Sequence, residues 1–137
     1  MAVANSTTSV IECADNAVWR VDDNVKIKTG DNAVLRGGDF CLFNTGQGAT
    51  IRAGRSSRIS SGDFSHIHAG AHSTVQAGLD CEIVVEQGAR VAADEGTVID
   101  FIFWQDDEEQ HSRYIVGEQI EPHIFYMIKN GVPEVIN

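Results

Sequence analysis

The chain has 137 residues, enough for one domain with a hydrophobic core. Its formal net charge of −10 argues against nucleic-acid binding through bulk attraction. No run of about 18 apolar residues exists, so no membrane-spanning helix is expected, and the first residues lack the pattern of a secretion signal. The three cysteines, Cys13, Cys41 and Cys81, lack metal-type spacing and indicate reduced thiols in the core of a cytoplasmic protein.

Residues 6–101 follow an eight-residue repeat. Glycine recurs with a strict period of eight, at Gly30, Gly38, Gly46, Gly54, Gly62, Gly70 and Gly78. With this glycine as position 0, twelve consecutive octads align without a gap, from STTSVIEC at residue 6 to DEGTVIDF at residue 94. Internal repetition of this regularity predicts a repeat architecture and outranks local propensity.

Each octad reads as one short strand followed by a turn. Positions 3, 5 and 7 share one face of the strand, whereas positions 4 and 6 share the other. Position 3 is small or apolar throughout, and position 5 is always apolar: Ile11, Trp19, Ile27, Leu35, Phe43, Ile51, Ile59, Ile67, Val75, Ile83, Val91 and Ile99. Glycine at position 0, with Asp or Asn at positions 1 and 2, is expected to supply positive-φ corners.

Two octads make a flattened coil of sixteen residues, and twelve make about six coils. At ~4.8 Å between stacked strands, such a rod is roughly 29 Å long. The sequence therefore predicts an all-β fold: a single β-solenoid (β-helix) over residues 1–101, closed by a C-terminal β-hairpin cap over residues 102–137. Because each coil contacts only its neighbours, both ends expose strand edges that need covering.

Residues sixteen apart are expected to stack, which creates columns of like side chains on the outside of the rod. Position 6 of one sheet reads Arg20, Arg36, Arg52, His68, Val84 and Asp100. Stacked arginines repel one another, so Arg20, Arg36, Arg52 and His68 form a candidate partner- or anion-binding surface. The alternative is that turn aspartates, Asp15, Asp31 and Asp63, bend over and neutralise the column.

Two further sets of rod residues carry weaker predictions. Phe40 and Phe64 occupy the normally polar position 2, where they either fold into the corner or form an interface with a second copy. No cofactor and no metal are expected. A weak candidate for a metal site is the set of His66, His68 and Glu82, because stacking places Glu82 beside His66.

The last third of the chain reads differently from the repeat. Residues 101–104 can finish the last strand, residues 105–110 form an acidic turn, and residues 113–116 return. Asn130-Gly131 is a strong hairpin signal between residues 126–129 and 132–136. The acidic turn presents a second candidate docking surface, the acidic cap surface of Asp106, Asp107, Glu108 and Glu109.

Octads such as GRSSRISS and GAHSTVQA resemble the octapeptide repeat of bacterial ice-nucleation proteins. With IDFIFW at 99–104, RYIVGEQIEP at 113–122 and YMIKNGVPEVI at 126–136, the chain is similar to small phage and prophage proteins that carry octads and a C-terminal cap. The Thr-x-Thr array of ice-nucleation repeats is absent from positions 4 and 6, so ice binding is not expected. The phage resemblance implies an accessory protein that occupies a host factor.

No nucleophile with a base and an orienting partner is apparent, and no paired-carboxylate cleft, so an enzyme is not expected.

The predicted function is a non-enzymatic protein-binding module in the bacterial cytoplasm. It would be a phage-derived inhibitor of a host protein or complex, such as a nuclease or a CRISPR-type defence complex. It would act through the charged ladders or the acidic cap. The alternatives are a structural, self-assembling solenoid, with a homodimer as one form, and an anion or nucleotide binder on the arginine face. Contact with a membrane and direct nucleic-acid binding are not expected.

Overall fold

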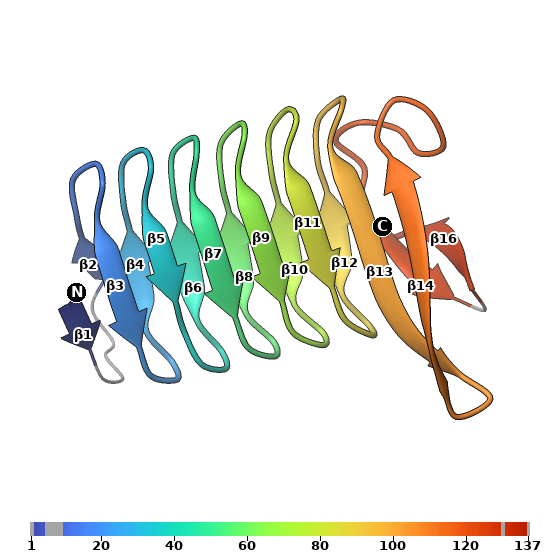
Figure 1. Cartoon of the computed structure of the whole chain (residues 1–137), viewed down its shortest axis with the longest axis horizontal. Helices are drawn as coiled ribbons and strands as arrows, with labels where there is room; N and C mark the ends of the chain where they lie inside the picture. Colours follow the sequence, from blue (N-terminus) through green and yellow to red (C-terminus); the bar gives the residue numbers. More distant parts are fainter. Residues whose placement is uncertain (1, 5–9, 130, 137) are drawn as a thin grey trace.

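The structure is a computed structural model that describes residues 2–4, 10–129 and 131–136. These residues form strands, turns and short connections and contain no helix. The strands build two facing sheets, parallel along the rod and antiparallel at its C-terminal end, that are wound from one continuous chain (Figure 1). The fold is therefore the predicted β-solenoid of about six sixteen-residue coils.

Successive octads alternate between the two sheets. Sheet A contains β1 (Ala2–Ala4), β3 (Val18–Val21), β5 (Val34–Arg36), β7 (Thr50–Ala53), β9 (His66–Ala69), β11 (Glu82–Val85), β13 (Val98–Gln105) and β14 (Glu108–Ile115). Sheet B contains β2 (Val10–Glu12), β4 (Lys26–Lys28), β6 (Leu42–Asn44), β8 (Arg58–Ser60), β10 (Thr74–Gln76), β12 (Arg90–Ala92), β15 (Tyr126–Lys129) and β16 (Val132–Val135). From β2 onward, the strands of the rod pair in parallel with strands sixteen residues away, as Ile51 does with Ile67 and Ile67 with Ile83, whereas β1 pairs with β3 at an offset of seventeen residues.

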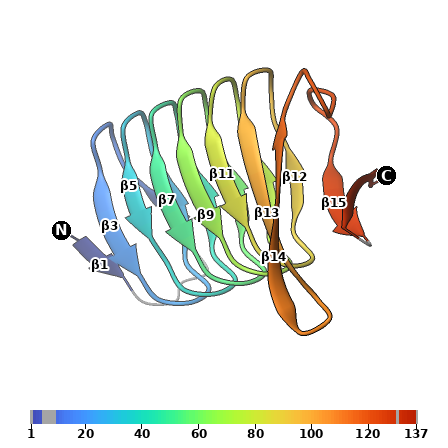
Figure 2. The same cartoon turned by 45° about the vertical axis from the view of Figure 1, so that its right-hand side comes forward.

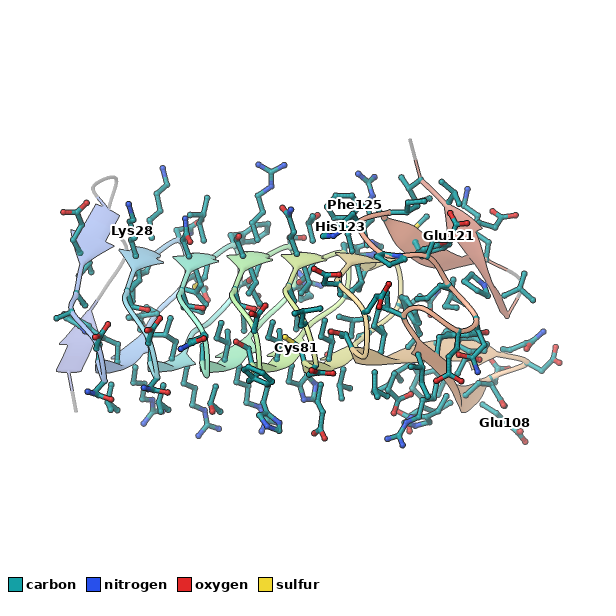
Figure 3. All side chains as sticks on the ribbon, turned by 90° about the horizontal axis from the view of Figure 1, so that it is seen from above. Lys28, Cys81, Glu108, Glu121, His123 and Phe125 are labelled. Atoms are coloured by element: carbon teal, nitrogen blue, oxygen red, sulfur yellow. The ribbon has the colours of Figure 1, made fainter. Side chains whose placement is uncertain are left out.

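The inward positions fill the space between the two sheets. From Ile27 to Ile99, every position-5 side chain is at most 3% exposed, whereas Ile11 and Trp19 in the first coils are only half-buried. Figure 3 looks along the gap between the sheets and shows Cys81 inside it, with Lys28 pointing outward from sheet B. The period-two alternation in the sequence therefore predicted the core correctly.

Buried polar groups at position 3 form hydrogen bonds with the preceding coil. The backbone N–H of Ser57 donates to Ser73 Oγ over 3.2 Å, and the Ser73 hydroxyl donates to the Gly54 carbonyl over 3.1 Å. Ser65 and Thr97 accept in the same way from backbone N–H groups sixteen residues earlier. These small side chains satisfy amides that face the core at the corners, where no strand partner is available.

The corners correct one detail of the expectation. The left-handed residue lies at position 2, with φ of 51–62° at every non-glycine: Asn16, Asn24, Asn32, Phe40, Ser56, Phe64, His72 and Asp80. The position-0 glycine has a different role, since a Cβ built on Gly70 would lie 2.7 Å from backbone atoms of Gly54 and Arg55. Glycine is required there because two coils approach each other closely, not because of its φ.

The C-terminal part closes the rod with antiparallel strands, as predicted. β13 pairs with β14 over eight residues, and β15 pairs with β12 and β16. Phe101, Val116, Ile120 and Tyr126 are buried and join the hydrophobic core of the rod. The edge strand β16 contains Pro133, which has no N–H to donate to a further strand.

The extent of the acidic turn differs from the prediction. The acidic turn is only Asp106-Asp107, because β13 continues to Gln105 and β14 already starts at Glu108. As expected for residues 101–104, β13 continues past the last octad, so rod and cap share one strand. The second hairpin, β15–β16, forms where expected, although Asn130 of its turn lies outside the described residues.

Candidate functional site

The arginine column predicted from the repeat is present on the outer face of sheet A. Arg20, Arg36 and Arg52 are register partners on β3, β5 and β7, and all three side chains are exposed. Half-buried His68 continues the column on β9. We call Arg20, Arg36 and Arg52 the arginine ladder. Its guanidinium groups belong to strands only ~4.8 Å apart, a spacing at which like charges repel.

Corner aspartates do not neutralise the arginine ladder. The backbone N–H of Asp31 donates to Asp15 Oδ1 over 2.8 Å, and that of Leu79 donates to Asp63 Oδ1 over 2.8 Å. Asp31 accepts likewise from the next coil. Among the residues that the structure describes, no ion pair includes an arginine of the ladder. The alternative in which these aspartates compensate the column is therefore contradicted.

A shallow hollow of about 260 Å³ lies at the C-terminal end of the ladder. It is lined by Arg52, His66, His68 and Glu82, with Thr50 at its rim. His66 Nδ1 lies 3.2 Å from Glu82 Oε2, so this pair forms as the register predicted. Within the described part of the chain, however, no three His, Cys, Asp or Glu side chains come close enough to hold a metal ion. The three side chains of the weak metal-site candidate, His66, His68 and Glu82, therefore do not come together as a metal site.

The predicted acidic cap surface lies at the tip of the β13–β14 hairpin, which projects beyond the coils (Figure 2). Asp106 and Asp107 have φ of 54° and 61°, as a two-residue hairpin turn requires. All four carboxylates from Asp106 to Glu109 are exposed. Of these four, only Glu109 joins an ion pair among the described residues, with His111 at 3.5 Å.

The sequence analysis did not single out Trp104, which lies beside this acidic tip. Its side chain is 60% exposed, and it faces Glu109 across the two strands. The backbone N–H of Trp104 donates to Gln87 Oε1 over 3.3 Å. Hollows of about 290 Å³ and 170 Å³ adjoin it, the first also lined by His72. Extending the strand alternation of β13 past residue 101 would have placed Trp104 on the outer face.

A small charged cluster at the base of the hairpin was also missed. His111 lies between two carboxylates, with Nδ1 at 3.6 Å from Asp100 and Nε2 at 3.5 Å from Glu109. Asp100 Oδ1 is buried without a hydrogen-bond partner among the described residues. The cluster bridges β13 and β14, so it ties the projecting hairpin to the last coil of the rod.

Phe40 and Phe64 do not form one interface. Both side chains are more than half exposed, at 53% and 57%, and both backbones are left-handed. Phe40 precedes β6 of sheet B and Phe64 precedes β9 of sheet A, so they lie at opposite edges of the flattened rod. Among the described residues, Phe64 has an exposed apolar neighbour in Leu79, whose carbonyl accepts the Phe64 backbone N–H.

The buried thiols behave as core residues. Burial is the main cause that raises the pKa of both Cys41 and Cys81 above the usual value, so both are neutral thiols near pH 7. Cys81 accepts from the Ser65 N–H and lies beside Thr97 in the column of small polar groups. A thiol in this state is a poor nucleophile, so neither residue offers a catalytic centre.

The remaining hollow of note lies on the outer face of sheet B. It measures about 330 Å³, and Phe125 from the segment before β15 forms one wall, above Arg58, Thr74 and Gln76. Figure 3 shows Phe125 and His123 on this side of the molecule. The hollow is open and shallow and contains no cluster of titratable groups.

Comparison with protein-family models, with curated proteins and with solved structures found no match. No helix among the described residues is long and apolar enough to cross a membrane. The interpretation of the surfaces therefore depends on their own chemistry.

Proposed function

We propose that the chain is a non-enzymatic protein-binding module that docks a basic partner surface with its projecting β13–β14 hairpin. The observation that carries this proposal is Trp104, which is 60% exposed beside four exposed carboxylates. A large aromatic side chain left in water gains little for the fold, whereas Trp is enriched among the residues that dominate binding energy at interfaces.

The charge of the hairpin tip indicates the chemistry of the partner. Three of its carboxylates, Asp106, Asp107 and Glu108, have no ion pair among the described residues. Carboxylates beside an aromatic ring suit arginine-rich or lysine-rich surfaces, because guanidinium groups bind carboxylates and also stack on indole. A protein site that normally holds nucleic acid has this character. The more specific role, a phage-derived inhibitor of a nuclease or a CRISPR-type complex, remains a prediction from the resemblance.

Several features support binding over catalysis. The hollows are shallow, and the hydroxyls of Ser73 and Thr97 inside the rod accept and donate hydrogen bonds with the backbone of the preceding coil. The polar groups that reach the surface are arranged in columns along the sheets and do not converge on one deep pocket. A flat sheet and a projecting hairpin offer surface for another macromolecule but little concave space for a small substrate.

The test is capture from bacterial lysate with the intact protein and three variants as bait. Trp104→Ala removes the aromatic side chain alone. The hairpin variant removes the four charges of the tip: Asp106→Asn, Asp107→Asn, Glu108→Gln and Glu109→Gln. The acid control removes four exposed charges elsewhere: Asp80→Asn, Glu95→Gln, Glu118→Gln and Glu121→Gln.

We expect a stoichiometric partner that binds the intact protein and the acid control, is lost with the hairpin variant, and is weakened at least tenfold by Trp104→Ala. Equal loss with the acid control would mean that overall charge, not the hairpin, drives binding. Equal retention by all baits would place the docking surface elsewhere. If the protein captures only copies of itself, the structural, self-assembling alternative replaces this proposal.

A further inference from the structure

The arginine ladder takes no part in the hairpin-docking proposal, yet the repulsion between its stacked arginines lowers the stability of the fold. The chain has ten Lys and Arg residues, and three of them occupy one column of stacked strands. Any small polar residue at these exposed positions would avoid the repulsion between like charges. An anionic group that lies across the column removes this repulsion and forms charge-assisted hydrogen bonds with the guanidinium groups.

The side chains next to the ladder favour a protein segment over a nucleic acid. Val18 and Val34 flank the arginines on the same outer face, and each is 44% exposed. Apolar side chains beside arginine are typical of protein interfaces, whereas a phosphate backbone selects polar and basic side chains throughout. The net charge of −10 also repels a dense polyanion more strongly than it repels a short acidic segment.

The chain itself displays such a segment, but the ladder of the same molecule is out of its reach. The hairpin is formed by β13 and β14, and β9 and β11 separate β13 from β7, the last strand of the ladder. This separation of three strand spacings is about 14 Å along the rod, with the first arginines farther away. Figure 1 shows the hairpin at one end of the rod and β3, β5 and β7 toward the other.

We propose that the arginine ladder of one copy binds the acidic hairpin of a second copy, in a reciprocal pair with opposite rod directions. Three exposed guanidinium groups face four exposed carboxylates, and Trp104 can pack against Val18 and Val34 or stack on an arginine. A reciprocal pair uses each surface twice and closes on itself, which doubles the buried area without forming a filament. This contact does not require any outside partner, and an outside partner with a basic surface would compete with the second copy for the hairpin.

The net charge determines the conditions for the test. At about 100 mM salt the Debye length is about 10 Å, so the repulsion between two copies of charge −10 is screened while close ion pairs persist. At about 1 M salt the Debye length is about 3 Å, and the ion pairs weaken as well. Association should therefore be present at the lower of these concentrations and lost at the higher.

The experiment is complementation between two variants, measured by sedimentation equilibrium. The ladder variant keeps the hairpin: Arg20→Ser, Arg36→Ser and Arg52→Ser. The hairpin variant defined above keeps the ladder. The matched control removes the same number of positive charges from the opposite sheet: Lys26→Ser, Lys28→Ser and Arg58→Ser. All the substituted side chains are exposed, and circular dichroism verifies that each variant is folded.

We expect the intact protein and the sheet B control to form dimers, and each variant to be monomeric alone. An equimolar mixture of the two variants should recover a 1:1 pair, at least tenfold weaker than the intact dimer because it retains one contact of two. A monomeric intact protein at about 100 mM salt overturns the inference. So does a mixture that stays monomeric, or dimers of either variant alone. Because the assay contains only this protein, its failure leaves the capture of an outside partner by the hairpin untouched.

Discussion

From β2 onward, the strands of the rod pair in parallel with strands sixteen residues away, whereas the cap pairs β13 with β14 and β15 with β16 antiparallel, between segments adjacent in the sequence. The rod can extend only by adding a further coil, because a parallel strand needs a crossover through the other sheet. The cap needs no crossover, since a two-residue turn reverses the chain. The antiparallel strands of the cap therefore end the repeat, because they pair with the edge strands to which a further coil would otherwise pair.

The two regions also differ in where their large side chains go. Rod aromatics at position 5, such as Phe43, lie between the sheets, and most outward positions are polar. The cap both buries aromatics, as in the edge-to-face contact of Phe101 with Tyr114, and leaves Trp104 in water. The rod thus has a largely structural interior, whereas the cap combines closing the core with presenting a surface.

The largest effect expected from this comparison is on global stability. Phe43→Ala should lower the free energy of unfolding by about 3–5 kcal/mol, because the ring is 1% exposed and leaves a cavity. Trp104→Ala should cost only about 1–2 kcal/mol, because most of that side chain already faces water. Urea denaturation followed by circular dichroism measures both. Equal losses would show that Trp104 is part of the core and weaken its role as a docking residue.

A smaller effect is expected from the hydroxyl groups inside the rod. Ser73→Ala should cost about 1–3 kcal/mol, because it leaves the buried Ser57 N–H without its acceptor. Ser112→Ala in β14 serves as the cap control and should stay within about 0.5 kcal/mol, since that hydroxyl has no partner among the described residues. A Ser73→Ala variant as stable as the intact protein would mean that the rod does not depend on these bonds.

The smallest expected effect is a gain in stability, whereas the substitutions above lower it. Phe64→Asn should stabilise the rod by about 0.5–1 kcal/mol, because Asn tolerates the left-handed φ of 59° better than Phe does. Asp107→Asn in the hairpin turn should change stability by less than about 0.5 kcal/mol, since both residue types tolerate its φ of 61°. The melting temperature compares the two. Destabilisation by Phe64→Asn would indicate that the ring packs on the corner despite its exposure.

The sequence by itself determined the rod, because a period of eight with alternation inside each octad admits one arrangement of inward and outward positions. It therefore predicted the coil of sixteen residues, the core from Ile27 to Ile99, the arginine ladder and the contact of His66 with Glu82. It also located the cap and its two hairpins, since an acidic turn and Asn-Gly are local signals.

Only the tertiary structure decided which partner a side chain bonds and on which edge of the rod it lies, because both depend on how the coils stack. Asp15 and Asp31 bind backbone amides of the next coil and not the arginines, a choice between two nearby partners that spacing does not resolve. The split of Phe40 and Phe64 to opposite edges follows from which sheet each octad joins. The hydrogen bond from the Trp104 backbone N–H to Gln87 likewise depends on how β13 lies against the preceding coil.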